Sequence, residues 1–190
     1  RYLVPSSSRY EGLAKRKVRG PRPAGRRTSA GRRSGPAGVA ASSTTTGGAT
    51  REVSVGELLD SAIGPLAHAR VTLPDDPAWR GERVRAVGNA LEQAIRNLVD
   101  NALRATEGAV RLDVRRASDE VEISVSDDGV GMTREELERA GDPFFSTRGH
   151  GEGMGLGLFV ARSVAEQLGG TLHIESESGR GTSVRMRLPR

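Results

Sequence analysis

The chain has 190 residues and a formal net charge of +5. It contains no cysteine, which excludes disulfides, thiolate metal sites and cysteine nucleophiles. No stretch approaches the roughly 18 consecutive apolar residues of a membrane-spanning helix, and none resembles a signal peptide, so we expect no membrane contact by this segment. The sequence begins with Arg1 and not with Met, so we expect a piece of a longer protein.

Residues 1–50 have the composition of a disordered tail or linker. They carry eleven Lys and Arg against one acidic residue, and 24 positions are Gly, Pro, Ser or Thr. Such a segment cannot bury enough apolar surface to offset its ordering entropy. Three interpretations of this segment stay open. It is a basic arm that binds phosphate backbones or anionic lipid, a plain linker, or an out-of-frame stretch at a place where a helical region belongs. Because aromatic stacking partners are almost absent, we do not expect nucleic acid as a partner.

Residues 51–190 carry the pattern of one folded domain. Ser54 and Glu57 have the spacing of a capping box, which predicts a helix that ends near Ile63. Residues 69–73 (ARVTL) predict a short strand that ends at a Pro/Asp turn.

A second helix is predicted from a cap-like pair, Asn89 and Glu92, to about Ala105. Apolar residues at helical spacing give it one core-facing stripe. The members of this stripe are Leu91, Ile95, Leu98 and Ala102.

Alternating apolar residues predict four further strands. The inward-facing residues are Val110, Leu112 and Val114, then Val121, Ile123 and Val125, then Leu172 and Ile174 in 171–176, and Val184, Met186 and Leu188 in 182–188. Between the second and third of these strands, a short capped helix begins at Thr133, and a longer helix runs to about Leu168 and stops at Gly169–Gly170. This order predicts a two-layer α/β sandwich with a mixed, mostly antiparallel sheet covered on one face by helices.

Polar residues recur on a second face of the helix 89–105. Gln93, Asn97 and Asn101 are spaced by four, and Arg104 projects from the same side. Asparagines are poor helix formers, because their amides compete for the backbone. The stripe is either a solvated face or a row of amide oxygens suited to a hard cation such as Mg²⁺, with Arg104 meeting a phosphate.

Asp127 follows three core residues of its strand with the same parity, so a carboxylate enters the buried face. A buried carboxylate needs a partner, and an amine such as that of adenine would serve. The alternative is a turn-forming Asp at a strand end, the role that we assign to Asp128. Gly129 and Gly131 would let the backbone approach a flat ring closely.

Alternating glycines from Gly149 to Gly157 lead directly into a helix. Successive backbone N–H groups before a helix N-terminus form an anion site. The string lacks the Lys-Ser/Thr of a Walker loop and the preceding strand of a dinucleotide fingerprint.

Four ordered signatures now give a resemblance. They are EQAIRNLVDNALRA at 92–105, DDGVGM at 127–132, DPFFSTR at 142–148 and GEGMGLGL at 151–158. They resemble the asparagine, adenine-binding, phenylalanine and glycine boxes of the ATP-binding catalytic domain of sensor histidine kinases, in the superfamily shared with gyrase, Hsp90 and MutL. The match covers essentially all of 51–190. The form of the phenylalanine box is most similar to nitrogen-regulation and redox-responsive sensor kinases.

The resemblance implies that ATP and Mg²⁺ bind here. Asn97 would ligate Mg²⁺, Asn101 and Arg104 would contact the phosphates, and Asp127 would hold the adenine amine. Residues 128–155 would form a mobile lid. The other residues that the resemblance places at ATP are Gly129, Gly131, Phe144, Phe145, Thr147, Arg148, Gly153, Gly155, Leu156, Gly157, Leu158 and Thr182.

Within that lid, Phe144 and Phe145 would act as a hydrophobic latch, a role compatible with simple core filling. Arg148 would lie near the phosphates, and Thr182, in the closing strand, near adenine.

ATP-hydrolysing relatives place a Glu four residues before the metal-binding Asn, where this chain has Gln93, which cannot take a proton. Glu92 is rotated by about 100° around the helix. We therefore expect phosphoryl transfer to a protein and not water activation, and we identify no catalytic side chain.

The phosphoacceptor is a separate question. Sensor kinases phosphorylate a His on a dimerisation hairpin, and none of His68, His150 and His173 fits that role. We expect the hairpin upstream or in trans, a response regulator receiver domain as further partner, and a cytoplasmic location. The alternatives are a protein serine kinase of the anti-sigma type, and a non-catalytic role in which the tail binds nucleic acid.

Overall fold

The structure, a computed structural model, describes residues 2–3, 50–67, 69–87, 89–147 and 154–190. Several predictions lie outside these ranges: the disorder of 4–49, the positions of His68 and His150, and the roles of Arg148 and Gly153.

The main sheet has six strands in the order β1-β7-β8-β6-β5-β3. Its neighbouring strands are antiparallel except for β3 and β5, which are parallel. The strands are β1 (Tyr2–Leu3), β3 (Val71–Thr72), β5 (Val110–Arg116), β6 (Glu120–Asp127), β7 (Thr171–Glu177) and β8 (Gly181–Pro189). A second, two-stranded sheet pairs β2 (Thr50–Ser54) with β4 (Arg83–Val87).

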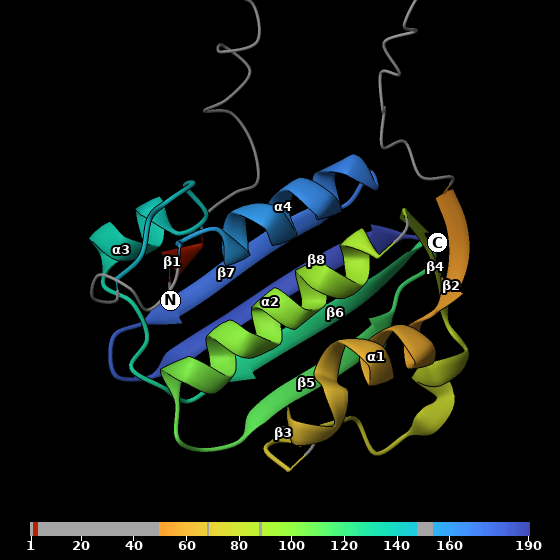
Figure 1. Ribbon diagram of the computed structural model, residues 1–190, viewed down its shortest axis with the longest axis horizontal. Helices are drawn as coiled ribbons and strands as arrows, with labels where there is room; N and C mark the ends of the chain where they lie inside the picture. Colours follow the sequence, from red (N-terminus) through yellow and green to blue (C-terminus); the bar gives the residue numbers. More distant parts are fainter. Residues whose placement is uncertain (1, 4–49, 68, 88, 148–153) are drawn as a thin grey trace, which may run out of the picture. The chain divides into compact units, whose positions relative to one another are not determined.

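Three helices lie over one face of the main sheet (Figure 1). They are α1 (Val55–Ala67), α2 (Ala90–Ala105) and α4 (Gly157–Gln167); the short α3 (Arg134–Arg139) and the 3-10 helix η2 (Pro77–Gly81) lie in the connections. The predicted two-layer sandwich with a mixed, mostly antiparallel sheet is confirmed.

The sheet contributes rows of apolar side chains to the core, because the strand registers align residues of equal parity. One row runs Leu172, Met186, Ile123 and Val114 across β7, β8, β6 and β5, and the next runs Ile174, Val184, Val125 and Leu112. All except the half-buried Val114 are buried. The predicted stripe of α2 (Leu91, Ile95, Leu98, Ala102) is buried against them.

The third row of the same face is polar. Ser176 of β7 lies opposite Thr182 of β8, and Thr182 lies opposite Asp127 of β6. The apolar core therefore ends at this row, and the end of the sheet offers hydroxyl and carboxylate groups to the space under the helices.

The other face of the sheet is mostly polar, as is common where antiparallel strands have one solvated face. Ion pairs link neighbouring strands there, including Arg187 with Glu122 and Arg185 with Glu175. The hydrogen bond and the negative charge of Glu122 raise the pKa of Arg187 above its ordinary value.

Two predicted helix signals hold. The capping box at Thr133 is formed with Glu136, and α4 ends with Gly169 at φ +77°, where the N–H of Gly170 bonds to the carbonyl of Ala165. The cap at Ser54 is half formed: its Oγ accepts from the N–H of Glu57 at 3.4 Å.

Other local predictions need correction. Asn89 stands at the start of α2 but makes no side-chain cap bond, and the side chain of Glu92 pairs with Arg96 one turn later. Helix α1 extends to Ala67 across a kink at Gly64, near the predicted end. The predicted strand 69–73 is two residues long, and β1, β2 and β4 were not predicted.

Candidate functional site

A cavity of about 630 Å³ lies between α2, the start of α4, the polar end of the sheet and the segment after β6. Its apolar wall includes Leu98, Val125, Met132, Leu158 and Val184. Its polar residues include Asn97, Asn101, Arg104, Asp127, Thr147 and Thr182. The cavity thus combines an apolar wall with several polar groups, the usual composition of a small-molecule site.

Helix α2 contributes the predicted polar stripe. Asn97, Asn101 and Arg104 line the cavity, whereas Gln93 is exposed and does not. Gln93 instead donates from Nε2 to Oδ1 of Asn97 at 3.1 Å. A carbonyl oxygen has two lone pairs, so Oδ1 of Asn97 keeps acceptor capacity for a cation.

The C-terminus of α2 is fixed by Arg70, a residue that the sequence did not single out. Its Nη2 donates to the carbonyls of Thr106 at 2.5 Å and Gly108 at 3.0 Å, and its Nη1 to that of Leu103 at 3.4 Å. A guanidinium at a helix C-terminus satisfies otherwise unpaired carbonyls and complements the helix dipole. Arg70 therefore holds the last turn of α2, which carries Arg104 and directly follows Asn101.

Asp127 ends β6 at the cavity wall, half-buried. Its Oδ1 accepts from the N–H of Gly129 at 2.9 Å. The neighbouring Asp128 is exposed, as predicted, and accepts from Oγ1 of Thr106 at 2.6 Å. The bond from Thr106 joins the turn after β6 to the end of α2, and the bond from Gly129 closes the turn itself.

The glycines of this turn lie against the backbone of their own chain. A Cβ on Gly129 would lie 2.2 Å from the carbonyl oxygen of Ala105, and one on Gly131 would lie 2.0 Å from that of Glu177. Gly131, with φ +62°, lines the cavity, and Gly129 does not. The close approach predicted for both residues is thus explained, at least in part, by packing within the chain.

The Pro-Phe-Phe segment places its two phenylalanines differently. Phe145 lines the cavity, with the guanidinium of Arg139 4.2 Å from the centre of its ring. Phe144 is 77% exposed at φ +66° and does not line the cavity. Only one of the two predicted latch residues therefore contacts this space.

The glycine-rich end of the cavity is formed by Gly155, Leu156, Gly157 and Leu158, which lead into α4. A Cβ on Gly157 would lie 3.0 Å from Nδ2 of Asn101. This glycine therefore leaves space beside the amide, at a helix N-terminus where backbone N–H groups favour an anion.

The arrangement suits an elongated anionic ligand with a flat apolar part. Amide oxygens and a guanidinium lie on α2 opposite the N-terminus of α4, and acceptors lie at the end of the sheet. Within the described ranges, no group of three or more His, Asp and Glu side chains is placed to hold a metal ion. A cation here would depend on Asn97 together with groups of the ligand.

The family model described as "Histidine kinase-, DNA gyrase B-, and HSP90-like ATPase" matches residues 86–190, which include every residue of this cavity. The chain belongs to this family.

Its relatives include sensor histidine kinases. Sensor histidine kinase ZraS of Klebsiella oxytoca is 41% identical over 110 residues, which are 56% of this chain and 23% of that protein. Histidine protein kinase DivJ of Caulobacter vibrioides is 42% identical over 111 residues, which are 56% of this chain and 19% of that protein. The matched part thus spans about a quarter or less of these relatives.

Solved structures of histidine kinases share the fold. The catalytic domain of histidine kinase ThkA superposes with a TM-score of 0.62 at 24% identity, over 74% of this chain and 97% of that one. Full-length ShkA in complex with AMPPNP gives a TM-score of 0.61 at 26% identity, over 75% of this chain and 31% of that one.

The part of this ATPase-family chain that the structure describes contains no helix long and apolar enough to cross a membrane. Of its histidines, His173 lies on the outer face of β7, opposite Arg185 and away from the cavity, as predicted.

One further contact of the ATPase-family domain was missed by sequence reasoning. Arg162 of α4 donates from Nη2 to the carbonyl of Ala140 at 3.3 Å, and its guanidinium lies against Gly141. Its buried Nε has no hydrogen-bond partner. This contact fixes the segment that leads to Phe145, and no local pattern in the sequence signals it.

Proposed function

We propose that residues 51–190 form the ATP–Mg²⁺-binding catalytic domain of a two-component sensor histidine kinase. The domain would transfer the γ-phosphoryl group to a histidine on a dimerisation hairpin that this chain does not supply. The observation that carries the proposal is one cavity whose lining joins Asp127 at the end of β6 with Asn97, Asn101 and Arg104 of α2. Family membership and the sensor histidine kinases among the relatives support it.

The residues fit ATP and Mg²⁺ by their chemistry. Asp127 is an acceptor for the adenine amine beside an apolar wall that would hold the ring. The free acceptor capacity of Asn97 suits Mg²⁺, and the guanidinium of Arg104 suits a phosphate. The space that Gly157 leaves beside Asn101 would be filled by a side chain at any other residue type.

The residue next to Asn97 on α2 favours phosphoryl transfer over hydrolysis. The side chain one turn earlier is the amide of Gln93, which donates to Asn97 and cannot take a proton. Phosphoryl transfer depends mainly on positioning and charge neutralisation, so a site without a general base suits a protein acceptor.

Partners and location follow from the proposed activity. The domain would meet a histidine-containing hairpin, upstream or in trans, and the phosphoryl group would pass to a response regulator receiver domain in the cytoplasm. His173 does not serve as acceptor in this scheme, because it lies on the outer face of the sheet.

The test is a transfer assay in trans. The chain is mixed with a separately made histidine-hairpin protein and ATP labelled at the γ-phosphate, with Asp127→Asn as the inactive control. We expect acid-labile phosphate on the hairpin protein when it is mixed with the natural chain, and none when it is mixed with Asp127→Asn. Acid-stable phosphoserine on a protein substrate would instead support a serine kinase of the anti-sigma type, and absence of any transfer would contradict the proposal.

A further inference from the structure

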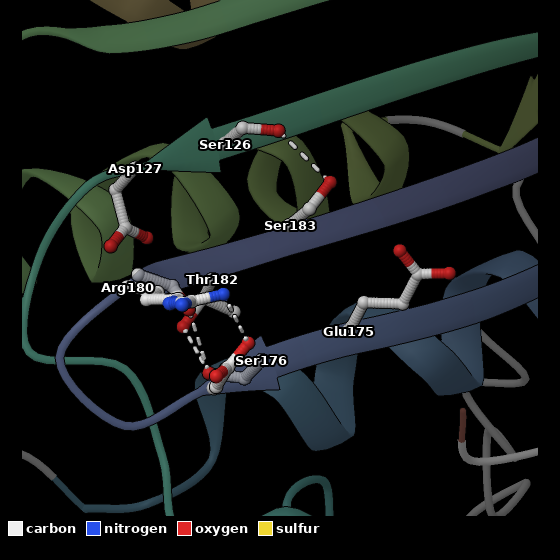
Figure 2. Close-up of a pocket in the computed structure, with 9 residues that line it drawn as sticks. Ser126, Asp127, Glu175, Ser176, Arg180, Thr182 and Ser183 are labelled. Carbon is white, nitrogen blue, oxygen red and sulfur yellow. Dashed lines mark hydrogen bonds and ion pairs between the residues drawn. The ribbon is translucent and has the colours of Figure 1, made fainter. Parts of the chain in front are cut away.

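The polar row at the end of the sheet contains a buried serine with no assigned role. Ser176 is only 4% exposed, lies directly opposite Thr182 and is one strand further from Asp127 (Figure 2). Its Oγ lies 3.0 Å from the carbonyl oxygen of Gly181 and 2.9 Å from Oγ1 of Thr182. Both contacts are within hydrogen-bonding distance.

Counting protons fixes the direction of both hydrogen bonds. The carbonyl of Gly181 can only accept, so Ser176 must donate its single proton to it. Ser176 has no second proton for Thr182, so Thr182 is the donor in the bond between the two hydroxyls. The proton of Thr182 is therefore directed at Ser176, and its hydroxyl can offer only lone pairs to other groups.

This direction matters because Thr182 and Asp127 both line the large cavity, and Ser176 does not. Asp127 is a carboxylate, an acceptor when ionised, and one of its oxygens is already bonded to the N–H of Gly129. The two side chains that the sheet end presents to a ligand are then both acceptors.

We propose that Ser176 is a positioning residue that sets nucleobase specificity: it holds the proton of Thr182 away from the cavity and so makes this end of the site accept hydrogen bonds only. This inference rests on the proposed ATP-binding function. A base with an exocyclic amine, such as adenine, meets the acceptors with N–H groups. A 6-oxo purine would direct a carbonyl at them and offer only its N1–H on this edge, so one acceptor would face a carbonyl oxygen and affinity would fall.

The experiment compares ATP with inosine triphosphate, which carries a carbonyl in place of the adenine amine. Dissociation constants of both Mg²⁺-nucleotides are measured by calorimetry for the full chain and for Ser176→Ala. We expect the natural chain to prefer ATP. In Ser176→Ala, Thr182 can turn its proton toward the carbonyl, so the preference should fall by about tenfold, mostly through tighter binding of inosine triphosphate.

If Ser176 had a purely structural role, Ser176→Ala would weaken the binding of both nucleotides by the same factor. That result, or an unchanged preference for ATP, would overturn the proposal. The matched control is Ser183→Ala. Ser183 is the next residue after Thr182, is bonded to Ser126 and does not line the large cavity, so the preference should not change. Ser176→Thr, which keeps a hydroxyl, should restore the natural preference.

A double-mutant cycle tests whether Ser176 acts through Thr182. Thr182→Val alone should reduce the preference, and Ser176→Ala added to it should change the preference no further. An additional change would contradict the proposed route. If Ser176→Ala fails to fold, as judged by the fluorescence of the buried Trp79, an unchanged preference in Thr182→Val still overturns the proposal. Absence of ATP binding by the natural chain would instead refute the proposed function itself.

Discussion

Gln93 donates a hydrogen bond from Nε2 to Oδ1 of Asn97, one turn further along α2. The side chain bonded to the proposed Mg²⁺ ligand is therefore a hydrogen-bond donor that cannot act as a base. In the proposed function, this position distinguishes transfer to a protein from water activation, because we expect the rest of the cavity to suit either reaction.

Replacing this donor tests that distinction. Gln93→Glu places a carboxylate where a water could be deprotonated, and a positioned base contributes a rate factor of roughly a hundred or more. We expect release of inorganic phosphate from ATP, in the absence of an acceptor protein, to rise by at least about tenfold over the natural chain. Gln167→Glu, on the exposed end of α4, is the control. A variant that binds ATP but hydrolyses no faster would show that position 93 does not limit hydrolysis.

Gly157→Ala tests the space beside Asn101. The added Cβ would lie 3.0 Å from Nδ2 of Asn101, so this amide must shift by a few tenths of an ångström, whereas the 3.6 Å to Cβ of Asn97 is an ordinary contact. We expect Mg²⁺-ATP affinity to fall by about fivefold or more, while the melting temperature stays level or rises because Ala favours the helix by up to about 1 kcal/mol. Gly81→Ala has nothing within 4 Å of its Cβ and serves as control. Equal Mg²⁺-ATP affinities of the natural chain, Gly157→Ala and Gly81→Ala would show that Asn101 does not contribute to the site.

Arg70→Met tests the cap on α2. The variant leaves carbonyls of Leu103, Thr106 and Gly108 without their charged donor. Hydrogen bonds to charged groups contribute about 1.5–3 kcal/mol each when buried, and Arg70 is exposed, so we expect a loss of roughly 1–2 kcal/mol in the free energy of unfolding. Urea denaturation followed by Trp79 fluorescence measures it.

The comparison for Arg70 is Arg111→Met, which breaks an exposed ion pair with Asp113 and should cost less than about 1 kcal/mol. Similar losses in the two variants would mean that the α2 cap adds no stability beyond that of a surface ion pair.

Local patterns predicted most of this fold. Alternation identified β5, β6, β7 and β8, and the stripe from Leu91 to Ala102 identified the buried face of α2, because both signals depend only on neighbouring residues. The cavity brings together Asn97, Asp127 and Thr182, which lie far apart in the sequence but carry family signatures.

The features that the sequence did not predict depend on contacts between residues that are far apart in the chain. Strands β2 and β4 are short and pair only with each other, and β3 is two residues long beside β5. Arg70 reaches carbonyls more than 30 residues away, and the bond that Ser176 makes follows from the β7–β8 register. The expected cap bond of Asn89 is absent, and spacing alone does not show that the side chain of Glu92 pairs with Arg96.

The most direct test of the account is calorimetric titration of the full chain and of Asp127→Asn with Mg²⁺-ATP. Asn keeps an oxygen for the N–H of Gly129 but offers a neutral amide to adenine. The account predicts saturable binding by the natural chain, a loss of about tenfold or more in Asp127→Asn, and no comparable loss in Asp128→Asn, whose side chain lies outside the cavity. Equal affinities of the natural chain and Asp127→Asn, or no binding by the natural chain, would contradict it.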